Sequence, residues 1–191
     1  SFGADQSIAL GWSQSEIQSA DFNGDGLPDF AAGTQAIYAN GIFPDLLHSS
    51  SNGIGGVTTI EYTPSTTFNN TLLPFPLQVV KTAAKSNNLG DSYTTQYSYA
   101  DGFWNGTERE FYGFGSIRVT DPEGSYVDTE FLQDAIFKGR IAEQRTYDIA
   151  GTLYSKTVHT WNSEDVTAAV RFIHLERKDN FVYDGDATGR R

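Results

Sequence analysis

The segment Tyr147-Asp148-Ile149-Ala150-Gly151-Thr152-Leu153 shows how this chain builds its fold. In such a segment the Asp fixes a reverse turn by bonding to its own backbone, and the Gly takes the positive φ that the turn needs. The pattern therefore predicts a strand ending in Tyr147, a turn, and a return strand opened by Leu153. It begins again, less completely, at Tyr183-Asp184-Gly185-Asp186. Units of this kind stack side by side into extended sheets, so we assign the pattern an architectural role.

The rest of the chain has the residue pattern of an all-β protein. Gly, Thr, Tyr and Phe are abundant, and turn residues recur at roughly the 8–12-residue spacing of short strands. A weak helical pattern lies near residues 164–170, but its β-branched residues argue against a helix there. We predict an antiparallel, meandering β-sheet with strands at residues 57–62, 77–82, 92–99, 116–120, 126–131, 141–147, 153–161 and 170–175.

Composition excludes several classes of function. The 191 residues include 24 acidic and 13 basic side chains, which gives a net charge of -11 at pH 7. That balance argues against a nucleic-acid partner, which requires clustered Lys and Arg. The chain has no Cys, so disulfides, thiolate zinc sites and a Cys nucleophile are excluded. Apolar runs fall short of the roughly 18 residues of a transmembrane helix, so we predict no membrane span.

The sequence also predicts two parts. Residues 1–45 contain a strand–loop–strand unit like one blade edge of a propeller, whereas residues 46–191 carry longer, aromatic-rich strands. Residues 49–56, rich in Ser and Gly, fit either a linker or a glycine-bent entrance to a hairpin. Neither Met nor a charged-then-apolar leader is present, so we expect Ser1 to be an internal position of a larger protein.

A candidate metal site lies in the first part, in Asp21-Phe22-Asn23-Gly24-Asp25-Gly26-Leu27-Pro28-Asp29. Ca²⁺ takes about six to eight oxygen ligands, and a short loop can supply them from alternate side chains and a backbone carbonyl. An EF-hand needs a Glu at position 12, where this chain has Ala32. The alternative is a turn of Asx and Gly residues that binds no metal. The predicted ligands are Asp21, Asn23, Asp25, Leu27 through its carbonyl, and Asp29.

One acidic cluster raises the question of catalysis. Glu108 and Glu110 are two residues apart, so on a strand they share a face and would form the carboxylate pair of a glycan-cleaving enzyme. The alternative, which we favour, is an edge strand whose charges face water while Phe111 and Phe114 pack beneath a Gly-rich turn. A Gly-x-Ser-x-Gly elbow is absent, and His159 lies in mid-strand. We therefore assign no catalytic residues and predict that the chain is not an enzyme.

These motifs follow one another in a characteristic order. The loop Asp21–Asp29 is followed by Asp45-Leu46-Leu47, Asn52-Gly53-Ile54-Gly55-Gly56, Leu73-Pro74-Phe75-Pro76, Glu108-Arg109-Glu110-Phe111-Tyr112-Gly113-Phe114-Gly115, and a Tyr-Asp turn with Trp161. The series, from about residue 15 to about residue 184, resembles the middle region of the B subunits of bacterial toxin complexes. These are the insecticidal Tc/SpvB-like proteins, which are related to Rhs and YD-repeat polypeptides.

The resemblance implies an FG-GAP/VCBS-type calcium loop at the end of a β-propeller, followed by the start of a hollow Rhs/YD-type β-sheet shell that encloses a toxin. It implies a non-enzymatic structural segment of a secreted bacterial virulence protein, with Ca²⁺ held by Asp21, Asn23, Asp25 and Asp29. The expected partners are the remainder of a larger polypeptide or other toxin-complex subunits. An alternative of a different class is an extracellular adhesion or filament-forming module that assembles through open strand edges.

Overall fold

The computed structural model describes residues 16–183 apart from 34, 40, 42, 44, 88, 168 and 169. In these residues the regular structure is β-strand, with one 3-10 turn, η1 (Ser65–Thr67). No helix in this part of the chain is long and apolar enough to cross a membrane. The all-β fold predicted from the sequence is confirmed. The chain divides into two compact units, Ser1–Leu46 and Leu47–Arg191.

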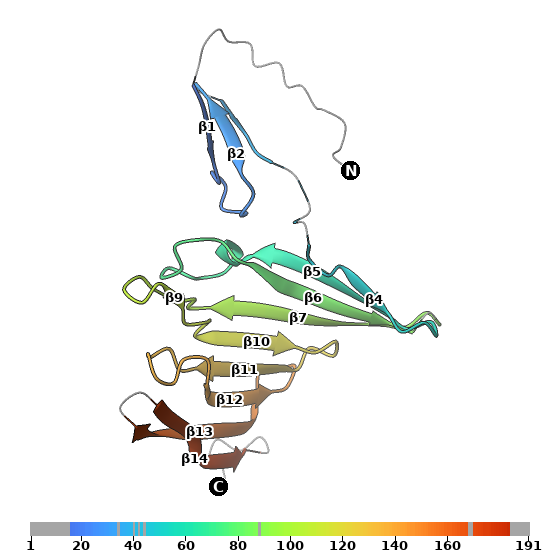
Figure 1. Ribbon diagram of the computed structural model, residues 1–191. Helices are drawn as coiled ribbons and strands as arrows, with labels where there is room; N and C mark the ends of the chain where they lie inside the picture. The colour runs from blue at the N-terminus through green and yellow to red at the C-terminus, as the bar shows by residue number, and fades with distance from the viewer. Residues whose placement is uncertain are drawn as a thin grey trace. The chain divides into compact units, whose positions relative to one another are not determined.

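The first unit contains a three-stranded antiparallel sheet in its described residues. Strands β1 (Ile17–Ala20), β2 (Asp29–Ala32) and β3 (Gln35–Ile37) are neighbours in the order of the sequence (Figure 1). The loop with the predicted metal ligands joins β1 to β2. The strand–loop–strand unit expected here is therefore present, and β3 adds a third strand to it.

The second unit is built on one antiparallel sheet, in which nine strands are described, in the order β14-β13-β12-β11-β10-β7-β6-β5-β4 (Figure 1). Between β7 and β10 the chain forms a separate two-stranded ribbon, β8 (Trp104–Asn105) with β9 (Glu110–Phe111). Each strand predicted from the sequence coincides with a strand of the large sheet. The strands of the large sheet are β4 (Ser49–Ser51), β5 (Val57–Pro64), β6 (Gln78–Ser86), β7 (Ser92–Ala100), β10 (Ser116–Thr120), β11 (Tyr126–Phe131), β12 (Ile141–Tyr147), β13 (Leu153–Thr167) and β14 (Val170–Val182).

Four hairpins of this sheet close with the same five-residue turn, and all four turns lie at one end of the sheet (Figure 1). The first residue is Asn or Asp, and its Oδ1 accepts the N–H of the fifth residue at N···O distances of 2.8, 3.3, 2.8 and 2.7 Å in chain order. The fourth residue is a glycine with φ of 100°, 108°, 96° and 82°. The turns are residues 52–56, 87–91, 121–125 and 148–152. The turn predicted between Tyr147 and Leu153 is thus confirmed, and three others share its design.

The large sheet is a single layer, so few of its side chains are buried. Among the described residues of both units, the buried hydrophobic ones are Ala32, Val79 and Tyr112. Tyr99 lies on one face of β7, where its ring centroid is 5.7 Å from that of Phe68 and 4.9 Å from that of Phe114. These two rings belong to the loops 65–77 and 101–115, which cover part of that face and supply the unit's aromatic cluster.

Strands β13 and β14 are longer than the sequence predicted. Both continue past the end of β12, because they pair with each other along most of their length and so satisfy each other's backbone groups. Residues 164–167, which carried the weak helical pattern, are therefore strand. Residues 49–56 form the entrance to a hairpin, since β4 pairs with β5 in a register that places Ser51 opposite Val57.

We expect the glycine at the fourth turn position to be required for its backbone conformation. Gly151 has a φ of 82°, and a Cβ there would make only an ordinary contact with Tyr126, at 3.6 Å. Gly151→Ala should therefore lower the free energy of unfolding by about 1–2 kcal/mol, the cost of a left-handed conformation for an L-residue. Gly106 lies outside that conformational region with open space around it, so Gly106→Ala should change stability by less than about 0.5 kcal/mol. Urea denaturation measures both, and equal losses would contradict the turn argument.

Candidate functional site

The loop that carries the predicted metal ligands is folded around the carboxylate of Asp21. Its oxygens accept backbone N–H groups from Gly24, Asp25 and Gly26 at 2.7, 3.1 and 2.8 Å. Hydrogen bonds to an ionised group are stronger than those between neutral groups. Asp21 therefore holds the first half of the loop in shape.

Asp29 holds the other end of the loop. Its side chain is 0% exposed, and its two oxygens accept the N–H groups of Phe22 and Ala39 at 2.9 and 2.7 Å. A buried carboxylate without such partners would be strongly destabilising. Between the two ends, Asn23 Nδ2 donates to Asp25 Oδ2 at 2.9 Å. Asp29 is thus tied to both the start of the loop and the segment after β3.

The loop has the oxygen-rich donor set that Ca²⁺ prefers, but its carboxylates bind backbone amides. In the part of the chain that the structure describes, no three His, Cys, Asp or Glu side chains are grouped to hold a metal ion. Leu27, the predicted carbonyl ligand, donates its own N–H to Asp25 Oδ1 at 2.7 Å. Calcium binding by Asp21, Asn23, Asp25, Leu27 and Asp29 stays a prediction.

Glu108 and Glu110, the carboxylates considered for catalysis, share one cation. Lys138 Nζ pairs with Glu110 and lies 3.8 Å from Glu108 Oε2. Tyr112, 3% exposed, donates its hydroxyl to Glu108 and accepts a hydrogen bond from Asn105 Nδ2 at 3.0 Å. The hydrogen bond to Glu108 raises the pKa of Tyr112. Because Lys138 holds both carboxylates and Tyr112 also bonds Glu108, this arrangement favours a structural role.

The aromatic residues of the same segment also fit a structural role. Phe111 and Phe114 pack edge to face with ring centroids 5.5 Å apart, and Phe114 in turn meets Tyr99 of the large sheet. Lys138 Nζ lies 4.3 Å from the centroid of the Tyr112 ring, a favourable position for a cation. The segment 108–115 therefore joins the β8–β9 ribbon to the face of the sheet.

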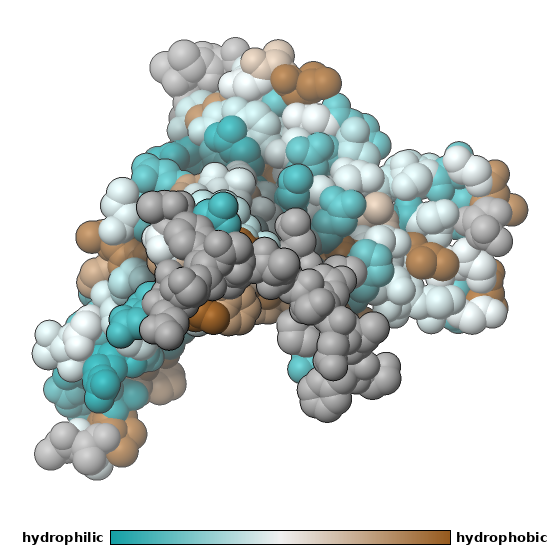
Figure 2. All heavy atoms as spheres, turned by 90° about the horizontal axis from the view of Figure 1, so that it is seen from above, coloured by the Kyte–Doolittle hydropathy of each residue, from teal (hydrophilic) through white to brown (hydrophobic). Residues whose placement is uncertain are grey.

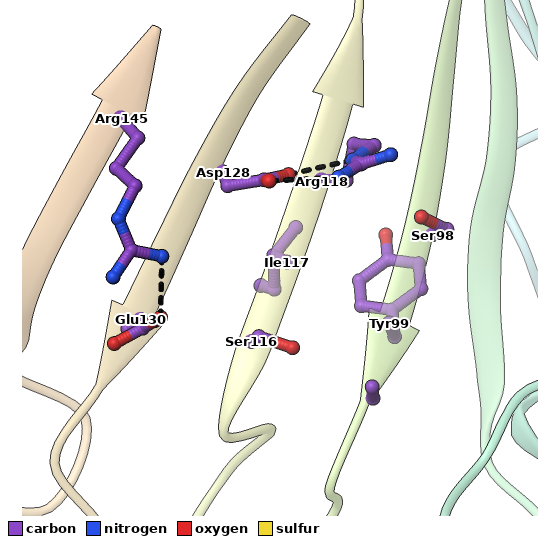
Figure 3. Close-up of a pocket in the computed structure, with 9 residues that line it drawn as sticks. Ser98, Tyr99, Ser116, Ile117, Arg118, Asp128, Glu130 and Arg145 are labelled. Carbon is purple, nitrogen blue, oxygen red and sulfur yellow. Dashed lines mark hydrogen bonds and ion pairs between the residues drawn. The ribbon is translucent and has the colours of Figure 1, made fainter. Parts of the chain in front are cut away.

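Two neighbouring groups of ion pairs lie across four strands of the large sheet. Arg118 forms two parallel hydrogen bonds with Asp128, at 2.6 and 2.8 Å (Figure 3). Arg145 bonds Glu130 at 2.8 Å and also pairs with Glu143, and Glu143 contacts Lys156 at 2.7 Å. The participants are Arg118 on β10, Asp128 and Glu130 on β11, Glu143 and Arg145 on β12, and Lys156 on β13.

The strand register creates these pairs. Arg118, Asp128, Arg145 and Lys156 lie directly opposite one another on successive strands, and therefore on one face of the sheet. Arg145 and Lys156 are like charges in facing positions, which is unfavourable by itself. Glu143 contacts both and removes the conflict. This network could not be predicted from the sequence, because the one available signal was charge at every second residue of single strands.

Several of these side chains line a shallow pocket of about 280 Å³. Arg118, Arg145, Asp128 and Glu130 face it together with Ser98 and Ser116 (Figure 3). Ligand sites usually occupy roughly 300–1,000 Å³, so this pocket is small. Its charges are balanced in pairs, which gives it no preference for an anionic or cationic ligand. These side chains are half-buried to exposed, and ion pairs that stay accessible to solvent contribute about 0–1 kcal/mol each, so we assign the network a structural role.

Two histidines of the β13–β14 pair have unusual surroundings. His159 and His174 each have a buried Nδ1 that lacks a hydrogen-bond partner among the described residues. His159 lies directly opposite Lys178. Burial and, to a smaller extent, the charge of Lys178 lower the pKa of His159. Both effects favour the neutral form of His159.

Comparison with known proteins gives one family and several related structures. A family model, that of the insecticide toxin TcdB middle/N-terminal region, matches residues 8–144. The chain is similar to a Photorhabdus luminescens Tc holotoxin pore, with a TM-score of 0.78, 17% identity, and coverage of 89% of this chain and 12% of that chain. Crystal structures described as TcdB2-TccC3-TEV and TcdB2-TccC3-Cdc42 give TM-scores of 0.74 and 0.68, with the same identity and coverage. No curated protein sequence matches.

These structural matches support the all-β fold. Their sequence identity of 17% is too low to show anything beyond the fold. This chain spans about an eighth of the length of the matched chains, as the coverage of 12% states.

Acidification is expected to destabilise the β13–β14 pair through His159. Its folded-state pKa lies below the ordinary value of about 6.5, so the unfolded chain takes up the proton first. The stability that neutral His159 contributes is thus complete above about pH 6.5 and is lost as the pH falls through the lower folded-state pKa. Thermal melts between about pH 8 and pH 5 should show a fall in Tm that His159→Gln reduces. The exposed His48 is the control, and an equal effect of His48→Gln would contradict the assignment.

Proposed function

Because this chain belongs to the family of the insecticide toxin TcdB middle/N-terminal region, we propose that it acts as a non-enzymatic wall segment of a secreted bacterial toxin-complex subunit. The chain is a structural region of such a subunit. In our proposal, the large sheet contributes to a shell that carries a toxin, and the first unit is the end of a propeller. The partners are the rest of the polypeptide and a companion subunit of the TccC type, which the related crystal structures contain.

The observation that supports this proposal is the single-layer sheet with two different faces. One face carries the ion pairs from Arg118 to Lys156, and the other carries Tyr99 with its aromatic neighbours. A globular enzyme needs a closed core, a concave site and poised catalytic groups. Here the acidic residues considered for catalysis are tied to Lys138. An extended sheet with balanced charges suits a wall.

The wall proposal predicts that a disrupted sheet exposes the enclosed toxin. Gly151→Val and Gly124→Val, introduced together into the full-length subunit, should break two turns, because both glycines have positive φ. In a complex with the companion subunit, limited proteolysis should then cleave the companion's C-terminal region, which the unchanged complex protects. Gly106→Val is the matched control and should leave protection intact. Full protection in the double variant, with the sheet shown to be disrupted, would refute the wall role.

Calcium is the second part of the proposal. Asp21, Asn23, Asp25, the Leu27 carbonyl and Asp29 would supply oxygen ligands to Ca²⁺ in the loop between β1 and β2. The support is the donor set itself and the fold of the loop around Asp21 and Asp29. Bound Ca²⁺ would offset the repulsion between these carboxylates and add to the stability that the amide hydrogen bonds give.

Calcium should raise the Tm of the protein. A ligand that binds only the folded state stabilises it by about 2.7 kcal/mol at a hundredfold excess over Kd, whereas Mg²⁺ should act far less because it demands an octahedral shell. Asp25→Asn keeps an acceptor for the Leu27 N–H, seen at 2.7 Å, but removes a charged ligand. This variant should melt like the unchanged protein in chelator and lose most of the calcium response. Superimposed melts with Ca²⁺ and with chelator would show that the loop is a metal-free turn.

Self-assembly through strand edges is the alternative function. Among the described residues, β4 and β14 have no partner strand on their outer side. Two features of β14 oppose strand addition, however. It carries charged residues such as Arg177 and Lys178, and its pairing with β13 has a register shift beside Trp161 of β13. We therefore favour the wall. Sedimentation of the protein as a monomer at high concentration would exclude filament formation.

A further inference from the structure

The two most exposed aliphatic side chains among the described residues lie on neighbouring turns. Ile54, in the turn between β4 and β5, is 90% exposed, and Leu89, in the turn between β6 and β7, is 87% exposed. Figure 2 shows hydrophobic atoms at the right-hand end of the view, where these two hairpins end. Single exposed apolar side chains are common on protein surfaces, whereas grouped ones mark interaction sites, and these two lie on adjacent turns.

The same hydrogen bonds occur in both turns. Asn52 Oδ1 accepts the N–H of Ile54 at 3.0 Å, and Asn87 Oδ1 accepts the N–H of Leu89 at 2.9 Å. Each aliphatic residue thus occupies the third position of a five-residue turn whose fifth N–H bonds the same Asn. Because these hydrogen bonds restrain the backbone at Ile54 and Leu89, a partner would have less conformational freedom to remove on binding.

The two side chains are also placed as a pair. The register sets Val57 opposite Ser86 and Ser86 opposite Ser92, so the two turns end at the same level of the sheet. Their centres are two strands apart, which is about 10 Å. The charged residues of this end are Lys85 and Asp91, of opposite sign, within residues 49–57 and 85–93. These two hairpin ends are therefore electrically neutral together, on a chain of net charge -11.

We propose that Ile54 and Leu89 are two anchors that insert into a pair of uncharged, apolar pockets on another part of the same polypeptide, outside these 191 residues. This inference rests on the proposed function, in which the chain is one segment of a larger toxin-complex subunit. The pockets would be spaced by about 10 Å, to match the distance between alternate strands of one sheet.

The size of the contact identifies the occupant. An aliphatic side chain buries about 60–120 Å² of apolar surface, so two of them remain far below the roughly 800 Å² per partner of a stable interface between separate proteins. A covalently linked partner needs much less, because the linkage raises its effective concentration. The matched structures leave ample room for such a partner, since this segment covers 12% of their chains.

A third exposed aliphatic side chain on a turn, that of Ile149, provides the matched control. It is 74% exposed and lies in a turn of the same design. Its side chain reaches across to the neighbouring turn, where it lies 3.0 Å from the position that a Cβ on Gly124 would occupy. Around Gly53 and Gly90 in the two anchor turns, by contrast, a Cβ would find open space. Ile149 thus has a neighbour on the adjacent turn of its own sheet.

Cysteine labelling in the full-length subunit tests the proposal. Leu89→Cys, Ile54→Cys and Ile149→Cys are each labelled with a maleimide, and the modified peptide is quantified by mass spectrometry in native buffer and in urea. We expect the two anchor positions to react at least about tenfold more slowly in the native protein than in urea, equivalent to ~1.4 kcal/mol of protection. Position 149 should react at nearly the same rate in both. Hydroxyl-radical footprinting of the unchanged protein gives a second readout that needs no substitution.

Three outcomes would overturn the assignment. Native labelling of the anchors as fast as in urea means that they stay in water. Protection that appears only when the companion subunit is added places the pockets on that subunit, and protection that grows with protein concentration indicates a second copy. A complex that still shields its toxin from protease while the anchors label freely would remove this inference and leave the wall function in place.

Discussion

The hydrogen bond from the fifth N–H of each turn to the side chain of its first residue is the constraint on which the second unit depends. In a layered protein, the buried face of a strand selects its register, because a slip of one residue would turn apolar side chains to water. This sheet is one layer, and the buried hydrophobic residues described in this unit are Val79 and Tyr112. Burial alone is therefore a weak guide to register. A five-residue turn with a fixed set of hydrogen bonds permits one pairing of its two strands, and so it supplies the missing constraint.

Both faces of the sheet follow from that register. Side-chain alternation places Arg118 and its ion-pair partners on one face and Tyr99 on the other. A slip of one residue between β11 and β12 would move Arg145 away from Glu130 and turn it to the face that carries Tyr99. Each of these solvent-accessible ion pairs contributes about 0–1 kcal/mol, too little to choose the register against a strained turn. The turns decide the pairing, and the ion pairs add modest stability to the result.

The parts of this structure that could be predicted from the sequence are the local ones. Alternating residues located the strands, and the chemistry of Asp148 and Gly151 located a turn. The turns that begin at Asn52 and Asn87 have the same hydrogen bonds without the preceding Tyr, so a search for a Tyr-Asp pattern misses them. The contacts between strands could not be predicted from the sequence, because an error of one residue in the register moves every side chain of a strand to the opposite face of the sheet. Asp29 shows the same limit, since one of its two partners is ten residues away.

In a single-layer sheet, the few residues that make the required contacts with other parts of a protein must also prevent unwanted contacts. Any extended segment can add to an open strand edge, because backbone groups are alike in all proteins. The outer strand β4 is short and consists of Ser49–Ser51, and β14 carries charges and a register shift, so both edges discourage indiscriminate pairing. A side chain on a rigid turn is more selective, because only a pocket of matching shape and spacing accepts it. Placing the most exposed aliphatic residues on turns therefore lets such a sheet join its neighbours specifically while its edges and its charge-balanced face stay inert.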